Sequence, residues 1–225
     1  CALPIYTLGV AHPTGYPVFM LVAHFFEKAL ALPIKPCLKV EVLNALFGVG
    51  ASLFTVAASR IVIVLAQGER DEVEQREADL AALITGGMLG VSPMLWEQVH
   101  IPEVYPFHLF LVTAAAYCWM RFELTRRDGY IFLAALPMGV GLAHHVTMVY
   151  MLPTAFLYLL YRKPFFLVAW VVRPFVGLVR LFKKSFRAGK SYPGWWGFLL
   201  ACLIGFLPLL SYGYLIWANK HTTGV

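Results

Sequence analysis

The chain has 225 residues, of which 60% are hydrophobic and 13% are charged, and its mean hydropathy is +0.72. A soluble domain carries about 25% charged residues, so this composition excludes an ordinary soluble protein and indicates an integral membrane protein. The net charge of +6 requires no nucleic acid as a partner. Its excess lies in two basic blocks beside apolar segments, where the positive-inside bias and anionic lipids account for it.

The first distinctive stretch is LGVAHPTGYP, residues 8–17, whose two prolines and two glycines cannot continue a regular helix. It contains one imidazole, His12, and one phenol, Tyr16. Irregular backbone at membrane depth is tolerated only where protein or water covers it. We therefore expect this loop to line a wet cavity or to lie at the membrane surface, and an ordinary tight turn is the simpler alternative.

The apolar stretch over residues 18–34 is interrupted by Glu27, Lys28 and Pro33. At about 17 residues it is at the lower limit for a membrane span. Its charges and its proline suit a surface-lying or re-entrant helix better.

Six apolar segments further along the chain are predicted to span the membrane. They cover residues 42–66, 80–96, 105–120, the two halves of 129–162 on either side of His144 and His145, and 195–217. A mixed-charge connection over 69–79 is expected to be solvated. The basic segment that begins at Arg162 is either an interfacial amphipathic helix or an ordinary cytoplasmic loop.

The sequence therefore predicts an all-α, polytopic transmembrane helix bundle that forms one domain over residues 1–225. Its parts are a non-cytoplasmic loop and surface or re-entrant helix (1–41), five spans (42–161), a basic cytoplasmic amphipathic segment (162–192) and a last span (193–225). With this arrangement both basic blocks lie on the cytoplasmic face. The loop over 8–17, residues 100–103 and the histidine pair then share the opposite face.

Several stretches resemble a membrane-protein family that was first catalogued as a domain of unknown function. They are residues 8–17, residues 92–110 (SPMLWEQVHIPEVYPFHLF), residues 139–153 (GVGLAHHVTMVYMLP) and, more weakly, residues 205–215 (GFLPLLSYGYL). The animal member of this family is an endoplasmic-reticulum protein O-mannosyltransferase of the glycosyltransferase C superfamily. The resemblance implies the N-terminal half of such a module, which would transfer mannose or another hexose from a polyprenyl-phosphate donor to protein hydroxyls.

This chemistry requires a base for the acceptor hydroxyl. It also requires positive charge, hydrogen-bond donors or a metal ion at the departing phosphate. The candidates are Glu103 and His12 as catalytic residues, with Tyr16, Tyr105, His144 and His145 binding substrate. The sequence demands no cofactor, and a divalent cation at the phosphate is one of the options.

Each candidate has a structural alternative. Glu103 could cap the helix that follows it, where its charge favours the N-terminal dipole. The histidine pair could be purely structural. Adjacent histidines point in different directions on a helix, so they are poor co-ligands for one metal ion. The cysteines Cys1, Cys37, Cys118 and Cys202 also lack the spacing of a zinc site.

The chain departs from the family at one important place. In the family, an acidic motif precedes the first loop, and its aspartate is the expected catalytic base. Here no acidic residue precedes Glu27, and by register the motif would lie before Cys1. The sequence therefore does not establish that the protein is an enzyme. The alternative is a shortened, non-catalytic relative that packs in a larger membrane complex. Small residues such as Gly86, Gly87 and Gly90 would suit that packing.

The expected partners are membrane lipid, a polyprenyl-phosphate sugar donor, a protein acceptor and other membrane subunits. The expected location is the bacterial inner membrane or the eukaryotic endoplasmic reticulum.

Overall fold

The computed structural model describes residues 2–7, 16–68, 72–162, 203 and 205–222, and every regular element in these ranges is a helix. The predicted all-α class is therefore confirmed. The elements are α1 (Ala2–Thr7), α2 (Pro17–Ala29), α3 (Pro36–Gln67), α4 (Glu72–Gly90), α5 (Pro93–Val99), α6 (Tyr105–Thr125), α7 (Gly129–His144), η1 (Val146–Tyr150), α8 (Met151–Arg162), η2 (Leu207–Ser211) and α11 (Tyr212–Thr222).

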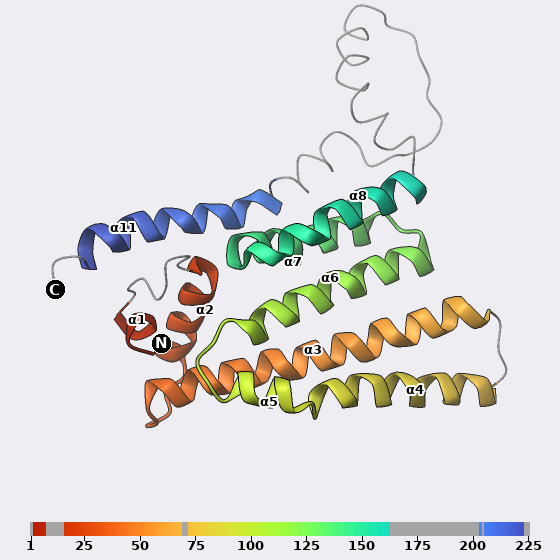
Figure 1. Cartoon of the computed structure of the whole chain (residues 1–225), viewed down its shortest axis with the longest axis horizontal. Helices are drawn as coiled ribbons and strands as arrows, with labels where there is room; N and C mark the ends of the chain where they lie inside the picture. The colour runs from red at the N-terminus through yellow and green to blue at the C-terminus, as the bar shows by residue number, and fades with distance from the viewer. Residues whose placement is uncertain (1, 8–15, 69–71, 163–202, 204, 223–225) are drawn as a thin grey trace, which may run out of the picture.

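The long helices form an antiparallel bundle in which α3 packs against both α4 and α6, and α6 packs against α7 (Figure 1). The chain runs along the bundle in α3, returns in α4 and α5, and then reverses again at each of the next two connections. The turn before α6 and the junction of α7 with η1 consequently lie at the same end of the bundle. The short helices α1 and α2 pack at this end too, with α2 crossing the ends of the long helices.

Prolines and side-chain caps explain where several helices begin. A proline stands in the first turn of α2, α3, α5 and α6, a position that needs no backbone N–H donor. The α4–α5 break is capped by Ser92, whose hydroxyl accepts a hydrogen bond from the Leu95 backbone N–H at 3.3 Å. At the next predicted break, α7 ends at His144 and η1 begins after His145. The sequence predicts interruptions of the 80–96 segment at Gly86, Gly87 and Pro93, and a break at His144 and His145. The breaks at Pro93 and at the histidine pair are confirmed, whereas the predicted interruption at the two glycines is wrong, because α4 continues to Gly90.

Two clusters of buried side chains hold the bundle together. The first lies at the end where α1 and α2 pack, and it contains Phe19 of α2, Leu43 of α3, Phe107 of α6 and Met148 of η1. The second lies further along α6 and α7 and is centred on Trp119. The first cluster fixes the position of α2 relative to the turn before α6, which is where the candidate site lies.

The buried face of α2 also contains a charge that the sequence placed on a surface helix. Glu27 is only 5% exposed because it follows Phe19, Met20 and Ala23 on one side of the helix. Its carboxylate pairs with the Lys39 ammonium of α3 at 3.4 Å. The same ammonium donates to the Glu27 backbone oxygen at 3.1 Å. This ion pair therefore ties the end of α2 to the start of α3.

The predicted count of about six spans is not supported by the described residues. Among them α3 alone is long and apolar enough to cross a membrane, and the number rises to two if α4 and α5, bent by 50° at their junction, form one broken span. The break after His144 leaves apolar pieces shorter than the roughly 20 residues that a crossing needs. α6 has 21 residues, but His108 and Arg121 reduce its apolar character.

Two predicted boundaries also differ from the structure. The connection expected over residues 69–79 is helical from Glu72, because acidic residues in the first turn of α4 favour the helix dipole and Asp79 pairs with Arg60 of α3. The first predicted span begins earlier than residue 42, since α3 starts at Pro36. The basic segment over 163–192 and residues 195–202 of the last predicted span lie outside the described residues.

Candidate functional site

Four of the six predicted site residues have their rings together at the end of the bundle where α2 packs. The Tyr16 ring lies 5.8 Å from the His144 ring and 5.9 Å from the His145 ring, measured between centroids. The Tyr105 ring is 5.9 Å from that of His145. These residues come from the start of α2, the start of α6 and the end of α7, so the fold assembles a site from three separate parts of the chain.

Tyr16 has an unusual backbone conformation. Its φ of 39° and ψ of 56° place it in the left-handed region, which is uncommon for a residue other than glycine. The next residue is Pro17, which disfavours the right-handed helical conformation at Tyr16. The ring packs almost parallel to the His145 imidazole, with an angle of 12° between the planes. The strained turn thus directs a phenol into the site.

Glu103 lies in the turn that precedes α6, and Asn44 of α3 holds this turn. The Asn44 Nδ2 group donates to the Ile101 carbonyl at 2.9 Å and to the Glu103 carbonyl at 3.0 Å. The Glu103 side chain, together with Tyr16, Tyr105 and Gln98, lines a cavity of about 420 Å³. No group in the described part of the chain pairs with its carboxylate.

The Glu103 carboxylate lies before the start of α6, where its charge favours the helix dipole, but it makes no capping hydrogen bond there. The residue at the N-cap of α6 is Val104, and no side chain caps it. The Glu103 carboxylate is therefore available to a ligand in the cavity.

The two adjacent histidines have different surroundings. His144 is 2% exposed, and its Nε2 donates to the Val104 carbonyl at 3.0 Å. Its ring packs edge-on against Phe107, with 4.8 Å between centroids. His145 is half-buried and borders a second cavity of about 180 Å³, which Tyr16 and Tyr212 also line. His144 lines the same cavity, but its ring is buried and held by Val104, whereas the half-buried His145 is more accessible to a ligand.

The structure adds residues that the sequence did not assign to the site. The His108 ring lies 4.8 Å from the His145 ring, and the His108 Nε2 lies 2.9 Å from the Thr147 hydroxyl. A signal for His108 was present, because it follows Tyr105 by three residues and so shares its helix face. Thr147 and Gln98 had no such signal, since a single polar residue in an apolar segment has many uses.

His100 shows that being close in sequence to Glu103 does not place a residue in this site. Its ring stacks on Trp96 with 5.4 Å between centroids, and it borders a different, apolar cavity between α3, α4 and α5. The other predicted residue, His12, lies outside the described residues. Within the described ranges, no group of three or more His, Cys, Asp or Glu side chains is arranged to hold a metal ion.

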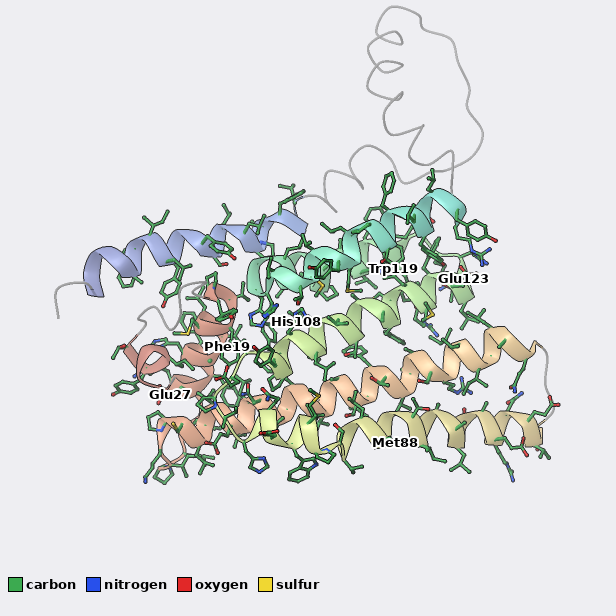
Figure 2. All side chains as sticks on the ribbon, in the orientation of Figure 1. Phe19, Glu27, Met88, His108, Trp119 and Glu123 are labelled. Atoms are coloured by element: carbon green, nitrogen blue, oxygen red, sulfur yellow. The ribbon has the colours of Figure 1, made fainter. Side chains whose placement is uncertain are left out.

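The arrangement combines a carboxylate without a partner, two phenols and an imidazole around two cavities that share Tyr16 as a wall. A carboxylate and phenols can hydrogen-bond the hydroxyl groups of a sugar or an acceptor. A neutral imidazole N–H can donate to an anionic oxygen, such as that of a phosphate. Figure 2 shows His108 toward this end of α6 and Glu123 toward the other, so the site belongs to one end of the bundle.

Comparisons with known proteins agree with the residues that suggested the family. Residues 2–166 match the family described as "Protein O-mannosyl-transferase TMEM260 N-terminal domain". A search of curated proteins found no match, and a search of solved structures found none either. The family match does not favour the alternative of a non-catalytic structural subunit. Most of the chain is covered by the match, and the chain therefore belongs to the family of the protein O-mannosyl-transferase TMEM260 N-terminal domain.

Proposed function

We propose that this domain forms part of the active site of a membrane glycosyltransferase, which transfers mannose or another hexose from a polyprenyl-phosphate donor to hydroxyl groups of a protein. Family membership supports the O-mannosyl transfer and the protein acceptor. It also supports a location in the endoplasmic-reticulum membrane. The lipid-phosphate donor is what the resemblance to the family implies, and an imidazole N–H in the site suits its phosphate.

The observation that carries the proposal is the convergence of Glu103, Tyr16, Tyr105 and His145 on two adjoining cavities. Glu103 faces the larger cavity, where a carboxylate can accept the hydrogen of an acceptor or sugar hydroxyl. The two tyrosines flank the cavities and bind the sugar. His145 faces the smaller cavity and donates to the phosphate oxygen that gains charge as the sugar leaves. His12, four residues before Tyr16 in the chain, contributes to the same site.

The proposal includes a multi-pass membrane setting. α3 is long and apolar enough to cross by itself, and the antiparallel helices packed beside it would accompany it through the bilayer. Arg126 and Arg162 both contact Glu123, so basic residues gather at the bundle end remote from the site. The positive-inside bias assigns that end to the cytoplasm and the site to the lumenal side.

The test is transfer of labelled mannose from polyprenyl-phosphate mannose to serine- and threonine-containing peptides by the purified protein in proteoliposomes. Glu103→Gln is expected to reduce transfer by about a hundredfold, since it removes the carboxylate that accepts the hydroxyl hydrogen. His12→Ala is expected to reduce transfer as well. Glu97→Gln is the matched control, because Glu97 is exposed on the preceding helix α5 and lies outside both cavities.

Unchanged turnover in both Glu103→Gln and His12→Ala would refute the site assignment. Wild-type protein that transfers no hexose from any polyprenyl-phosphate donor would refute the function.

A further inference from the structure

A chain of hydrogen bonds joins three polar side chains at the end of the bundle. The His108 Nε2 of α6 lies 2.9 Å from the Thr147 Oγ1 of η1. The same hydroxyl oxygen lies 2.7 Å from the His145 Nδ1. Thr147 therefore bridges two imidazoles that come from different helical segments and are separated by 37 positions in the sequence.

The backbone of η1 determines which atoms donate and which accept in these hydrogen bonds. The Thr147 backbone N–H donates to the His145 Nδ1 at 3.3 Å, so that the His145 side chain caps η1. An imidazole nitrogen that accepts from an N–H carries a lone pair and no proton. The Thr147 hydroxyl must therefore donate its hydrogen to Nδ1, and its oxygen is left to accept a hydrogen from the His108 Nε2.

This direction fixes the protonation of the neutral His145 ring. With Nδ1 as an acceptor, the proton of the ring is on Nε2. The described residues supply no protein partner for Nε2, and the half-buried ring borders the cavity of about 180 Å³ next to Tyr16. The Nε2–H group is thus a hydrogen-bond donor whose partner would come from a ligand.

We propose that Thr147 and His108 are positioning residues that hold His145 with its Nε2–H directed to an anionic phosphate oxygen in the smaller cavity. This inference rests on the proposed function for the identity of the phosphate, a lipid-linked one. The neighbouring His144 cannot fill the same role, because its own Nε2–H is donated to the Val104 carbonyl.

These three side chains do not work as a proton relay. In a relay His108 would pass its Nε2 proton to Thr147 and would then have to take up a new proton at Nδ1. The His108 Nδ1 is buried and has no hydrogen-bond partner within the described part of the chain, so no group is in place to supply that proton. His145 is therefore a hydrogen-bond donor to the phosphate and not the acid that protonates a leaving group.

The first measurement is the tautomer of His145 in the purified protein in detergent micelles. Two-bond ¹H–¹⁵N correlation spectra of protein labelled with ¹⁵N-histidine distinguish a protonated from a lone-pair ring nitrogen. His145→Gln assigns the signal among the seven histidines. We expect Nε2–H in wild type and in Thr147→Ser, Thr147→Val and His108→Phe, because the Thr147 backbone N–H still donates to the His145 Nδ1 in each.

The second measurement is the affinity for polyprenyl phosphate without a sugar, determined with the same variants. Thr147→Val is expected to weaken binding by about tenfold, the effect of losing one hydrogen bond to a charged group, and Thr147→Ser is expected to restore it. Thr154→Val is the control, because among the described residues the Thr154 hydroxyl bonds only the Tyr150 carbonyl one turn before it, at 3.3 Å.

An Nδ1–H tautomer in the wild-type protein would overturn the inference. It would also be overturned if Thr147→Val left the phosphate affinity unchanged. Neither measurement requires turnover. A protein that showed both expected effects but transferred no hexose would retain this phosphate site and lose the proposed function.

Discussion

The Asn44 side chain is fully buried in α3, and its amide nitrogen makes two hydrogen bonds to the turn that carries Glu103. A buried backbone carbonyl without a donor costs about 1–3 kcal/mol, so these two bonds fix the turn as well as stabilise it. The position of Glu103 at the cavity thus depends on one polar residue of the neighbouring helix.

We expect Asn44→Leu to lower the stability of the folded protein by about 1–3 kcal/mol, since the Glu103 carbonyl loses its donor. The Ile101 carbonyl loses one of two donors and still accepts from the Glu103 backbone N–H at 2.7 Å. Asn44→Asp should be worse, because a carboxylate would face the same two carbonyl oxygens. The thermal unfolding midpoint in detergent measures the change. Ser52→Ala is the control on the same helix, as the Ser52 hydroxyl bonds only the Gly48 carbonyl one turn away within the described part of the chain. An equal midpoint for Asn44→Leu and Ser52→Ala would contradict the role given to Asn44.

At the residue scale, the sequence predicted the site in part. Tyr16, Tyr105 and His145 were chosen from conspicuous local contexts and from the family resemblance, and the structure brings their rings together. Thr147 was missed because its role depends on a contact with α6, which no local pattern reveals. The burial of Glu27 was missed for the same reason, since its partner Lys39 belongs to another helix.

At the scale of elements, α4 approaches α3 most closely at Gly86. A Cβ atom at Gly86 would clash with the Val56 Cγ2 and would lie 2.7 Å from the Ser52 carbonyl oxygen of α3. A Cβ at the adjacent Gly87 would meet nothing within 4 Å. The two glycines differ only in the side of α4 on which they lie.

This pair gives a matched test of helix packing. Gly86→Ala should destabilise the protein by about 1–3 kcal/mol, because α4 must move away from α3. Gly87→Ala should leave stability unchanged or raise it by up to about 1 kcal/mol, since alanine favours a helix over glycine. The measurement is the thermal unfolding midpoint of both variants in the same detergent. Equal losses would show that general helix flexibility, and not the contact at Gly86, determines the result.

The helix boundaries show which sequence patterns predict breaks reliably. Pro93 and the His144–His145 pair correctly predicted breaks, because prolines and polar pairs interrupt apolar helices locally. The charged stretch over 69–79 was wrongly assigned to a connection. Charge alone cannot distinguish a solvated loop from a solvated helix, and here acidic residues in the first turn favour the helix. Counting apolar stretches also overestimated the helices that are able to cross a membrane alone.

At the scale of the whole molecule, Glu123 connects α6 to α8 at the end remote from the site (Figure 2). Its carboxylate accepts hydrogen bonds from Tyr158 and Arg162 of α8. It also pairs with Arg126, whose Nη1 is 3.0 Å away. The Glu123 side chain is only 12% exposed, so these charge-assisted bonds are screened less by solvent than a surface pair would be.

We expect Glu123→Gln to lower stability by about 1–3 kcal/mol, because an amide is a weaker partner for two guanidinium groups. Asp79→Asn is the comparison, since the Asp79–Arg60 pair is about half exposed and such pairs contribute about 0–1 kcal/mol. Both values come from thermal or denaturant unfolding of the purified protein. A larger effect for Asp79→Asn would reverse this ranking and refute the role of the buried carboxylate.

The two connections of α6 have a mechanical consequence. The segment formed by η1 and α8 is attached to α6 through His108 and Thr147 near one end and through Glu123, Tyr158 and Arg162 near the other. A helical segment that is attached at both ends tilts less easily than one attached at a single end. We therefore expect the side of the site that contains His108 and His145 to keep its shape when a ligand binds.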